Sequence, residues 1–143
     1  MSKIAIVYWS GTGNTEAMAD LVAQGVRAKG SDADLINAMD FGPERLDEYD
    51  AYAFGCPAMG AEELEETEFA PMFDAVKGSL SGKDAALFGS YGWGDGEWMR
   101  NWEERAKNDG ATLVGGEGLI VNETPDDEAL EKCAALGAEL VKE

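Results

Sequence analysis

The 143-residue sequence contains no histidine and only two cysteines, and its 29 Asp and Glu residues far outnumber its 11 Lys and Arg residues. Without histidine, the chain lacks the commonest general base and metal ligand, and no Ser-His or Cys-His nucleophile pair is available. Cys56 and Cys133 form no C-x-x-C motif and are too few to hold a zinc ion or an iron–sulfur cluster within the chain. We therefore expect both cysteines to be small buried hydrophobic residues.

The formal net charge of −18 at pH 7 disfavours nucleic acids and anionic membranes as partners, because both would repel the chain. It favours partners with basic docking faces. No apolar run is long enough to span a bilayer, and no signal-peptide pattern precedes the first strand pattern at Lys3. We therefore expect a cytoplasmic protein, and its length suits one domain that spans residues 1–143.

Strand and helix patterns alternate along the chain. Apolar runs rich in β-branched and aromatic residues predict buried strands at residues 4–9, 34–37, 51–56 and 85–89, and a fifth strand that is interrupted at 115–118 and resumes at 119–121. Helical spacing predicts helices around 18–26, with Gly30 as C-cap, at 69–76 and 97–107, and from about 125 to 140. The prediction is an α/β fold with a doubly wound, five-stranded parallel sheet, because right-handed crossovers place helices on both faces.

A loop of small polar residues separates the first predicted strand from the first predicted helix. It reads Ser10-Gly11-Thr12-Gly13-Asn14-Thr15. A strand, loop and helix in this order direct backbone N–H groups and the positive end of the helix dipole at one point, where a phosphate can bind. The loop lacks the Walker lysine, and Glu16 replaces the third glycine of a dinucleotide fingerprint. The alternative is that these residues only cap the helix.

Two further loops are expected at the same edge of the sheet, because ligands of open parallel sheets bind at the carboxyl ends of the strands. The loop after the third strand covers 57–62, and the loop after the fourth covers 90–96. Trp93 is bracketed by glycines, and together with Met59 it favours a planar heteroaromatic ligand. Ordinary burial of Trp93 is the alternative.

Together, the three loops resemble those of short-chain flavodoxins, and the resemblance covers the whole chain. It rests on Ser10 to Thr15, on Ala58-Met59-Gly60 followed by Glu62, and on Ser90 to Gly96. The fifth strand resumes at Leu119 without the long insertion of other members. The resemblance implies the strand order 2-1-3-4-5, noncovalently bound FMN, and a low-potential, monomeric carrier. Such a carrier passes single electrons between redox enzymes by shuttling between semiquinone and hydroquinone.

The resemblance also implies roles for individual residues. The 10–15 loop would hold the FMN phosphate, with Ser90 nearby. Met59 and Trp93 would sandwich the isoalloxazine, and Glu62 would accept a hydrogen bond from the flavin N3–H. The implied cofactor-binding residues are Ser10, Gly11, Thr12, Gly13, Asn14, Thr15, Pro57, Ala58, Met59, Gly60, Ala61, Glu62, Ser90, Tyr91, Gly92, Trp93 and Gly94.

The backbone around Tyr91 and Gly92 is expected to contact the pyrimidine end of the flavin. The Gly60 carbonyl is expected to turn toward flavin N5 when the flavin takes one electron and a proton, which glycine permits because it has no Cβ. Two positions depart from the family pattern. Pro57 stands where many relatives have a hydroxyl residue, and Ala61 stands where Asp, Asn, Ser or Gly is usual.

An acidic cluster lies beside the expected flavin site. It consists of Glu62, Glu63, Glu65, Glu66 and Glu68, and Asp95 and Glu97 border the other side. One interpretation is a solvated face. The other is a rim that steers the basic face of a reductase or oxidoreductase toward the flavin. Trp98 and Trp102 are expected to pack a helix onto the sheet, and Trp9 is expected to lie behind the phosphate loop.

Three other functions have different requirements. A response-regulator receiver needs acidic residues after the first strand and an Asp after the third, where this chain has Tyr8-Trp9-Ser10 and Gly55-Cys56-Pro57. An FMN-dependent NAD(P)H:quinone reductase would oxidise a nicotinamide unaided, and a noncatalytic scaffold would bind no flavin. The motifs favour an electron-transfer protein that has no substrate turnover of its own.

Overall fold

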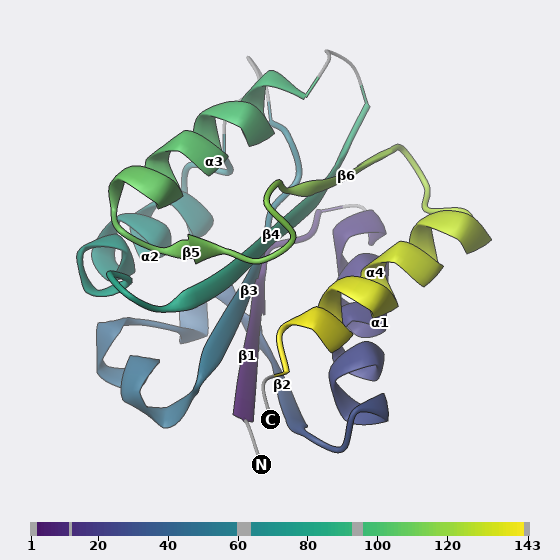
Figure 1. The fold of residues 1–143 in the computed structure, drawn as a ribbon. Coiled ribbons are helices and arrows are strands. Elements are labelled where there is room, and N and C mark those ends of the chain that lie inside the picture. The colour runs from purple at the N-terminus through teal and green to yellow at the C-terminus, as the bar shows by residue number, and fades with distance from the viewer. Residues whose placement is uncertain (1–2, 12, 60–63, 93–95, 142–143) are drawn as a thin grey trace.

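The computed structural model describes residues 3–11, 13–59, 64–92 and 96–141, and it has a parallel sheet between two layers of helices (Figure 1). The strands are β1 (Lys3–Tyr8), β2 (Asp32–Asn37), β3 (Ala51–Gly55), β4 (Asp84–Tyr91), β5 (Thr112–Leu113) and β6 (Leu119–Asn122). The helices are α1 (Asn14–Ala28), α2 (Phe69–Val76), α3 (Glu97–Asn108) and α4 (Asp127–Glu139). Short 3₁₀ helices follow β2 and α2, namely η1 (Ala38–Asp40), η2 (Pro43–Glu48) and η3 (Lys77–Ser79).

The sheet has the order β2-β1-β3-β4-β5, and β6 also pairs with β4. This confirms the predicted fold class and strand order. The predicted fifth strand is divided, because β5 pairs with the start of β4 and β6 pairs with its end. Gly115 and Gly116 form the break, with φ of 85° and 82°. This left-handed backbone conformation is costly for any residue that has a Cβ.

The strand β4 is longer than its sequence pattern predicts. Ser90 and Tyr91 belong to its end, where they pair with Val121 and Asn122 of β6. A serine and a tyrosine before a glycine-rich run favour a loop when they are considered locally. Pairing with a strand some 30 residues later extends β4 to the edge of the sheet where the predicted site lies.

The core lies on both faces of the sheet. Along β1, Ile4 and Ile6 pack with residues of α1 and α4, whereas Ala5 and Val7 pack with residues of α2 and α3. This alternation follows from the two-residue period of a strand. A continuous apolar run such as that of β1 is therefore required when both faces are covered.

The tryptophans of α3 hold that helix on the sheet, as predicted. Trp98 and Trp102 are almost fully buried, and the Trp98 Nε1–H donates to the Cys56 carbonyl over 3.2 Å. The Trp102 ring meets the ring of Phe69 edge-on, with a centroid distance of 5.3 Å. Bulky aromatic contacts of this kind join α2 and α3 into one layer.

The helices α1 and α4 pack through two glycines. A Cβ on Gly25 would lie 1.9 Å from the Ala134 carbonyl oxygen, and a Cβ on Gly137 would lie 2.0 Å from that of Val22. Neither position leaves room for a larger residue. At the end of α1 the C-cap residue is Lys29 rather than the predicted Gly30, which follows it with φ of 84°.

The two cysteines are free and fully buried, as predicted. Cys133 lies in α4 and Cys56 follows β3. Burial raises the pKa of each thiol to about 12. Both thiols are therefore protonated and unreactive in the folded chain at neutral pH.

Candidate functional site

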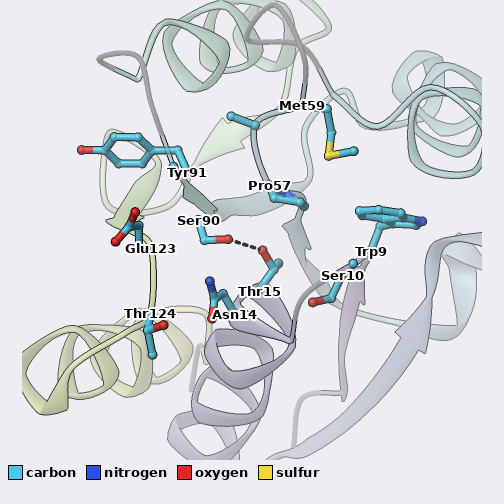
Figure 2. A pocket seen from close by; sticks show the side chains of 13 residues that line it. Trp9, Ser10, Asn14, Thr15, Pro57, Met59, Ser90, Tyr91, Glu123 and Thr124 are labelled. Carbon is cyan, nitrogen blue, oxygen red and sulfur yellow. Dashed lines mark hydrogen bonds between the residues drawn. The ribbon is translucent and has the colours of Figure 1, made fainter.

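A pocket of about 450 Å³ lies at the carboxyl edge of the sheet (Figure 2). Its lining comes from the end of β4, from the segments that follow β1, β3, β4 and β6, and from the first turn of α1. The lining residues are Trp9, Ser10, Gly11, Asn14, Thr15, Pro57, Ala58, Met59, Ser90, Tyr91, Gly92, Glu123 and Thr124. The volume falls in the range that is typical of small-molecule and cofactor sites.

The N-terminus of α1 forms the first part of the pocket. The Ser10 hydroxyl oxygen accepts hydrogen bonds from the backbone N–H groups of Gly13, over 3.1 Å, and Glu16, over 3.3 Å. Its own O–H remains available to donate to a ligand. The N–H groups of Asn14 and Thr15 have no acceptor within the helix, because they belong to its first turn. Ser10 therefore caps the helix and also contributes to an anion site.

Two buried hydroxyls connect the phosphate loop with the end of β4. Thr15 Oγ1 lies 3.0 Å from Ser90 Oγ, and either oxygen can be the donor. Figure 2 shows this hydrogen bond at the centre of the pocket. Thr15 is 1% exposed and Ser90 is 5% exposed, so each hydroxyl provides the partner that the other needs.

Backbone hydrogen bonds continue beyond the strand ends and hold the pocket segments together. The Trp9 N–H donates to the Gly55 carbonyl over 3.0 Å, and the Ala58 N–H donates to the Ser90 carbonyl over 3.0 Å. On the other side, the Glu123 N–H donates to the Tyr91 carbonyl over 2.7 Å. These segments form the base of a preorganised pocket.

Apolar side chains line the remainder of the pocket. The Trp9 ring packs against the backbone of Gly11, where an added Cβ would come within 3.0 Å of the ring. This agrees with the prediction that Trp9 lies behind the phosphate loop. Met59 is 36% exposed, and Tyr91 packs on Trp98 with a ring centroid distance of 5.5 Å. The pocket thus combines hydrogen-bond donors with apolar surface for a flat ring.

The segment after β6 supplies residues that the sequence reasoning missed. Glu123 and Thr124 line the pocket, and Glu123 has φ of 57°, in the left-handed region. A turn sequence, Asn122-Glu123-Thr124-Pro125, directly follows the last strand pattern. The rule that ligands bind at the carboxyl ends of parallel strands applies to this strand too, and could have identified the segment. Trp9 was also missed as a lining residue.

The flavodoxin family model matches residues 6–137. The chain belongs to the flavodoxin family. It is 47% identical to the flavodoxin of Clostridium beijerinckii over 135 residues, which cover 94% of this chain and 96% of that protein. It is 45% identical to the flavodoxin of Megasphaera elsdenii over 139 residues, which cover 97% of this chain and 98% of that protein. The solution structure of two-electron reduced Megasphaera elsdenii flavodoxin matches with a TM-score of 0.88 and covers 96% of this chain and 97% of that chain.

Flavodoxins are electron carriers that bind FMN noncovalently, and this chain shares their function. The predicted cofactor and the predicted carrier function are thereby confirmed. The alternative, an FMN-dependent NAD(P)H:quinone reductase, is not favoured. Within the described part of the chain, no helix is long and apolar enough to cross a membrane.

The structure brings together the predicted flavodoxin site residues that it describes. Those that line the pocket are Ser10, Gly11, Asn14, Thr15, Pro57, Ala58, Met59, Ser90, Tyr91 and Gly92. Gly13 lies in the same loop as the helix N-cap, with φ of 96°, and is not part of the lining. The predicted site residues Thr12, Gly60, Ala61, Glu62, Trp93 and Gly94 lie outside the described residues.

The described residues fit FMN. The first turn of α1 offers uncharged N–H and O–H donors that suit a phosphate. Trp9 and Met59 offer apolar surface to an aromatic ring, and the Thr15–Ser90 pair lies in the same pocket. No Lys or Arg is among the described lining residues, so the groups available to a phosphate there are the donors at the helix terminus rather than a paired cation.

One prediction about the acidic cluster of this flavodoxin is wrong. Glu65 is only 5% exposed, so it belongs neither to a solvated face nor to a docking rim. Its carboxylate accepts hydrogen bonds from the N–H groups of Thr67, Glu68 and Phe69 and from the Thr67 hydroxyl. Burial would raise the pKa of Glu65, but these hydrogen bonds outweigh burial and lower it. The N–H donors lie at and just before the start of α2, where no carbonyl of the helix can accept from them.

Proposed function

We propose that residues 1–143 form one domain that binds FMN across the pocket of Figure 2. It carries single electrons between redox enzymes as a cytoplasmic monomer and turns over no substrate of its own. Bound FMN supplies the redox chemistry, while the chain supplies position and electrostatics. One observation carries the proposal. The same pocket contains the N-terminus of α1, with no Lys or Arg among the described lining residues, and an apolar surface.

The phosphate end of the cofactor belongs at the start of α1. The N–H groups of Asn14 and Thr15 and the O–H of Ser10 are available there as donors. Each hydrogen bond to a charged group contributes about 1.5 to 3 kcal/mol, whereas the helix dipole contributes about 0.3 to 1 kcal/mol, or up to about 2 in partly buried geometry. The hydrogen bonds therefore dominate the binding of the phosphate in a chain whose net charge is −18.

The ring end belongs beside the segments that follow β1 and β3 and the end of β4. Met59 and Trp9 present apolar surface to the pocket, and the backbone of Tyr91 and Gly92 lies at its edge. Exclusion of water from one side of the ring disfavours the addition of negative charge to it. This arrangement suits a carrier of low potential.

The charge of the protein acts in the same direction. Glu123 lines the pocket, and the whole chain is strongly negative. Like-charge repulsion opposes the accumulation of negative charge at the cofactor. The same field attracts a partner that has a basic docking face, and raises its association rate more than its affinity. This is the basis for proposing basic reductases and oxidoreductases as partners.

The test is anaerobic, stepwise reduction of the purified protein while its visible spectrum is recorded. A yellow protein that is reduced in two separate one-electron steps supports the carrier. Direct reduction in one two-electron step, with oxidation of NADPH by the protein alone, would favour the reductase. A colourless protein that refuses added FMN would overturn the proposal and support a noncatalytic scaffold.

A further inference from the structure

Cys56 anchors the start of the segment that leads from β3 to the pocket. Its N–H donates to the Phe88 carbonyl over 3.1 Å, and its own carbonyl accepts from Trp98 Nε1 over 3.2 Å. Its thiol donates weakly to the Pro57 carbonyl over 3.5 Å. The residue is fully buried, and its backbone is attached to β4 and α3 while its sulfur is left to contact other residues.

Glu65 holds the other end of the same segment, next to the start of α2. Its backbone N–H donates to the Cys56 sulfur over 3.3 Å, which joins residues that are nine positions apart. Its carbonyl accepts from the Ala70 N–H over 2.8 Å. Its carboxylate accepts from Glu68 N over 2.7 Å and from Phe69 N over 2.9 Å. The residue is thus fixed to the start of α2 and to Cys56 at once.

A helix cap alone does not require this arrangement. The cap of α4 is the exposed Asp126, whose carboxylate accepts from the Ala129 N–H over 2.8 Å. Glu65, in contrast, is buried, and its backbone closes the segment on Cys56 while its side chain caps α2. The described residues 57–59 of this segment form one wall of the pocket. The place of residues 57–59 therefore depends on the Ala58–Ser90 hydrogen bond and on Cys56, the preceding residue, whose sulfur accepts from the Glu65 N–H.

We propose that Glu65 is a positioning residue that acts through Cys56 to hold the 57–59 wall against the ring of the bound cofactor. The inference deepens the proposed function and rests on FMN binding in this pocket. When the Glu65–Cys56 contact is lost, the wall moves away from the ring and water reaches it. Binding of the ring weakens, and negative charge is added to it more easily because the ring is better hydrated. The phosphate end, which is built from α1, is unaffected.

The test compares Glu65→Gln and Cys56→Ala with the unmodified protein. Dissociation constants of the apoprotein are measured for FMN and for riboflavin, which lacks the phosphate, and both one-electron potentials are measured on the loaded protein. In Glu65→Gln we expect both dissociation constants to rise about tenfold, the low end of the loss of a hydrogen bond to a charged group, and in Cys56→Ala, which removes a hydrogen bond to a neutral thiol, we expect a rise of about two- to tenfold. Their ratio stays constant, and the potentials become less negative.

Three further variants separate an effect on positioning from an effect on stability. Val76→Ala truncates a fully buried residue at the other end of α2. It is expected to lower the unfolding midpoint without changing the dissociation constants or the potentials. Cys56→Ser keeps an acceptor for the Glu65 N–H and should recover part of the affinity lost in Cys56→Ala. Glu65→Gln weakens the hydrogen bonds of the carboxylate to residues 67–69, and Cys56→Ala removes the sulfur that accepts from the Glu65 N–H. The double variant Glu65→Gln/Cys56→Ala should lose less affinity than the product of the two single losses, because both substitutions loosen the same residue, Glu65.

Unchanged riboflavin affinity and potentials in both Glu65→Gln and Cys56→Ala would overturn the inference. The inference would also be overturned if Val76→Ala changed the dissociation constants and the potentials as much as these two variants do. If Glu65→Gln does not fold, Cys56→Ala alone decides the question. Failure of the unmodified protein to bind FMN is a different result, because it defeats the proposed function itself.

Discussion

Thr15 at the start of α1 and Ser90 near the end of β4 share a hydrogen bond between two buried hydroxyls, although 75 positions separate them in the chain. The pair connects the segment that we assign to the phosphate with the strand end that we assign to the ring. Since neither hydroxyl is accessible to bulk water, each depends on the other as its partner. The Thr15–Ser90 pair therefore contributes to stability as well as to the shape of the site.

Ser90→Ala should destabilise the apoprotein by about 1 to 3 kcal/mol, because it leaves the Thr15 hydroxyl buried without a partner. The double variant Thr15→Val/Ser90→Ala, in which neither polar group remains, should lose less stability than the two single variants lose together. Urea unfolding of the apoproteins measures both effects. Additive losses would show that the two hydroxyls do not interact.

Gly137→Ala should destabilise the protein although alanine favours helix formation by about 1 kcal/mol. The new Cβ would lie 2.0 Å from the Val22 carbonyl oxygen, and relief of such overpacking costs about 1 to 3 kcal/mol or more. Gly78→Ala is the matched control, because a Cβ there meets nothing within 4 Å. Thermal unfolding compares the two, and a Gly137→Ala protein as stable as the control would refute the close packing of α1 on α4.

Variants of Glu123 can separate the effect of backbone strain on stability from the effect of negative charge on the potentials of the cofactor. Asn tolerates the left-handed conformation better than Gln, so Glu123→Asn should be more stable than Glu123→Gln by about 0.5 to 1 kcal/mol. Both variants remove the same negative charge from the pocket lining and should raise the potentials of the cofactor equally. Urea unfolding and a redox titration test the two statements independently. Equal stability would exclude strain, and unchanged potentials would exclude an electrostatic role.

Glu65 should make stability depend on pH in the acid range. Its folded pKa is lower than its ordinary value, so its contribution is complete above the unfolded pKa of about 4.3 and is lost as the pH falls through the folded pKa. The difference in unfolding free energy between the unmodified apoprotein and Glu65→Gln should therefore shrink as the pH falls below about 4.3. Urea titrations at several pH values measure this. Glu66→Gln removes a charge from an exposed neighbour and should change stability little.

The rate at which a reductase with a basic docking face reduces the protein should fall as the ionic strength rises. Screening shortens the range of electrostatic attraction to about 10 Å at 0.1 M salt and about 3 Å at 1 M. Stopped-flow measurements over this range test the proposed steering. A rate that does not respond to salt would count against a docking role for the acidic surface.

Local patterns were sufficient to predict most of the fold and part of the site. The alternation of apolar runs and helical spacing places the elements, and the helix Phe69–Val76 matches its prediction residue for residue. The small polar loop before α1 and the segments after β3 and β4 were assigned to one edge of a parallel sheet, where the structure joins them in one pocket. Each of these features depends on residues that are close in sequence, so their periodicity and composition are visible in the chain.

Other features depend on contacts between distant residues. Ser90 and Tyr91 resemble a loop until β6 pairs with them, and Glu65 resembles a solvated carboxylate until the first turn of α2 and the Cys56 sulfur surround it. Glu123 enters the pocket because its N–H bonds to Tyr91. The amino-acid order thus set the elements, the α/β class and the chemistry of the loops. Burial, register and side-chain partners were settled by packing, since their energies arise between segments that folding brings together.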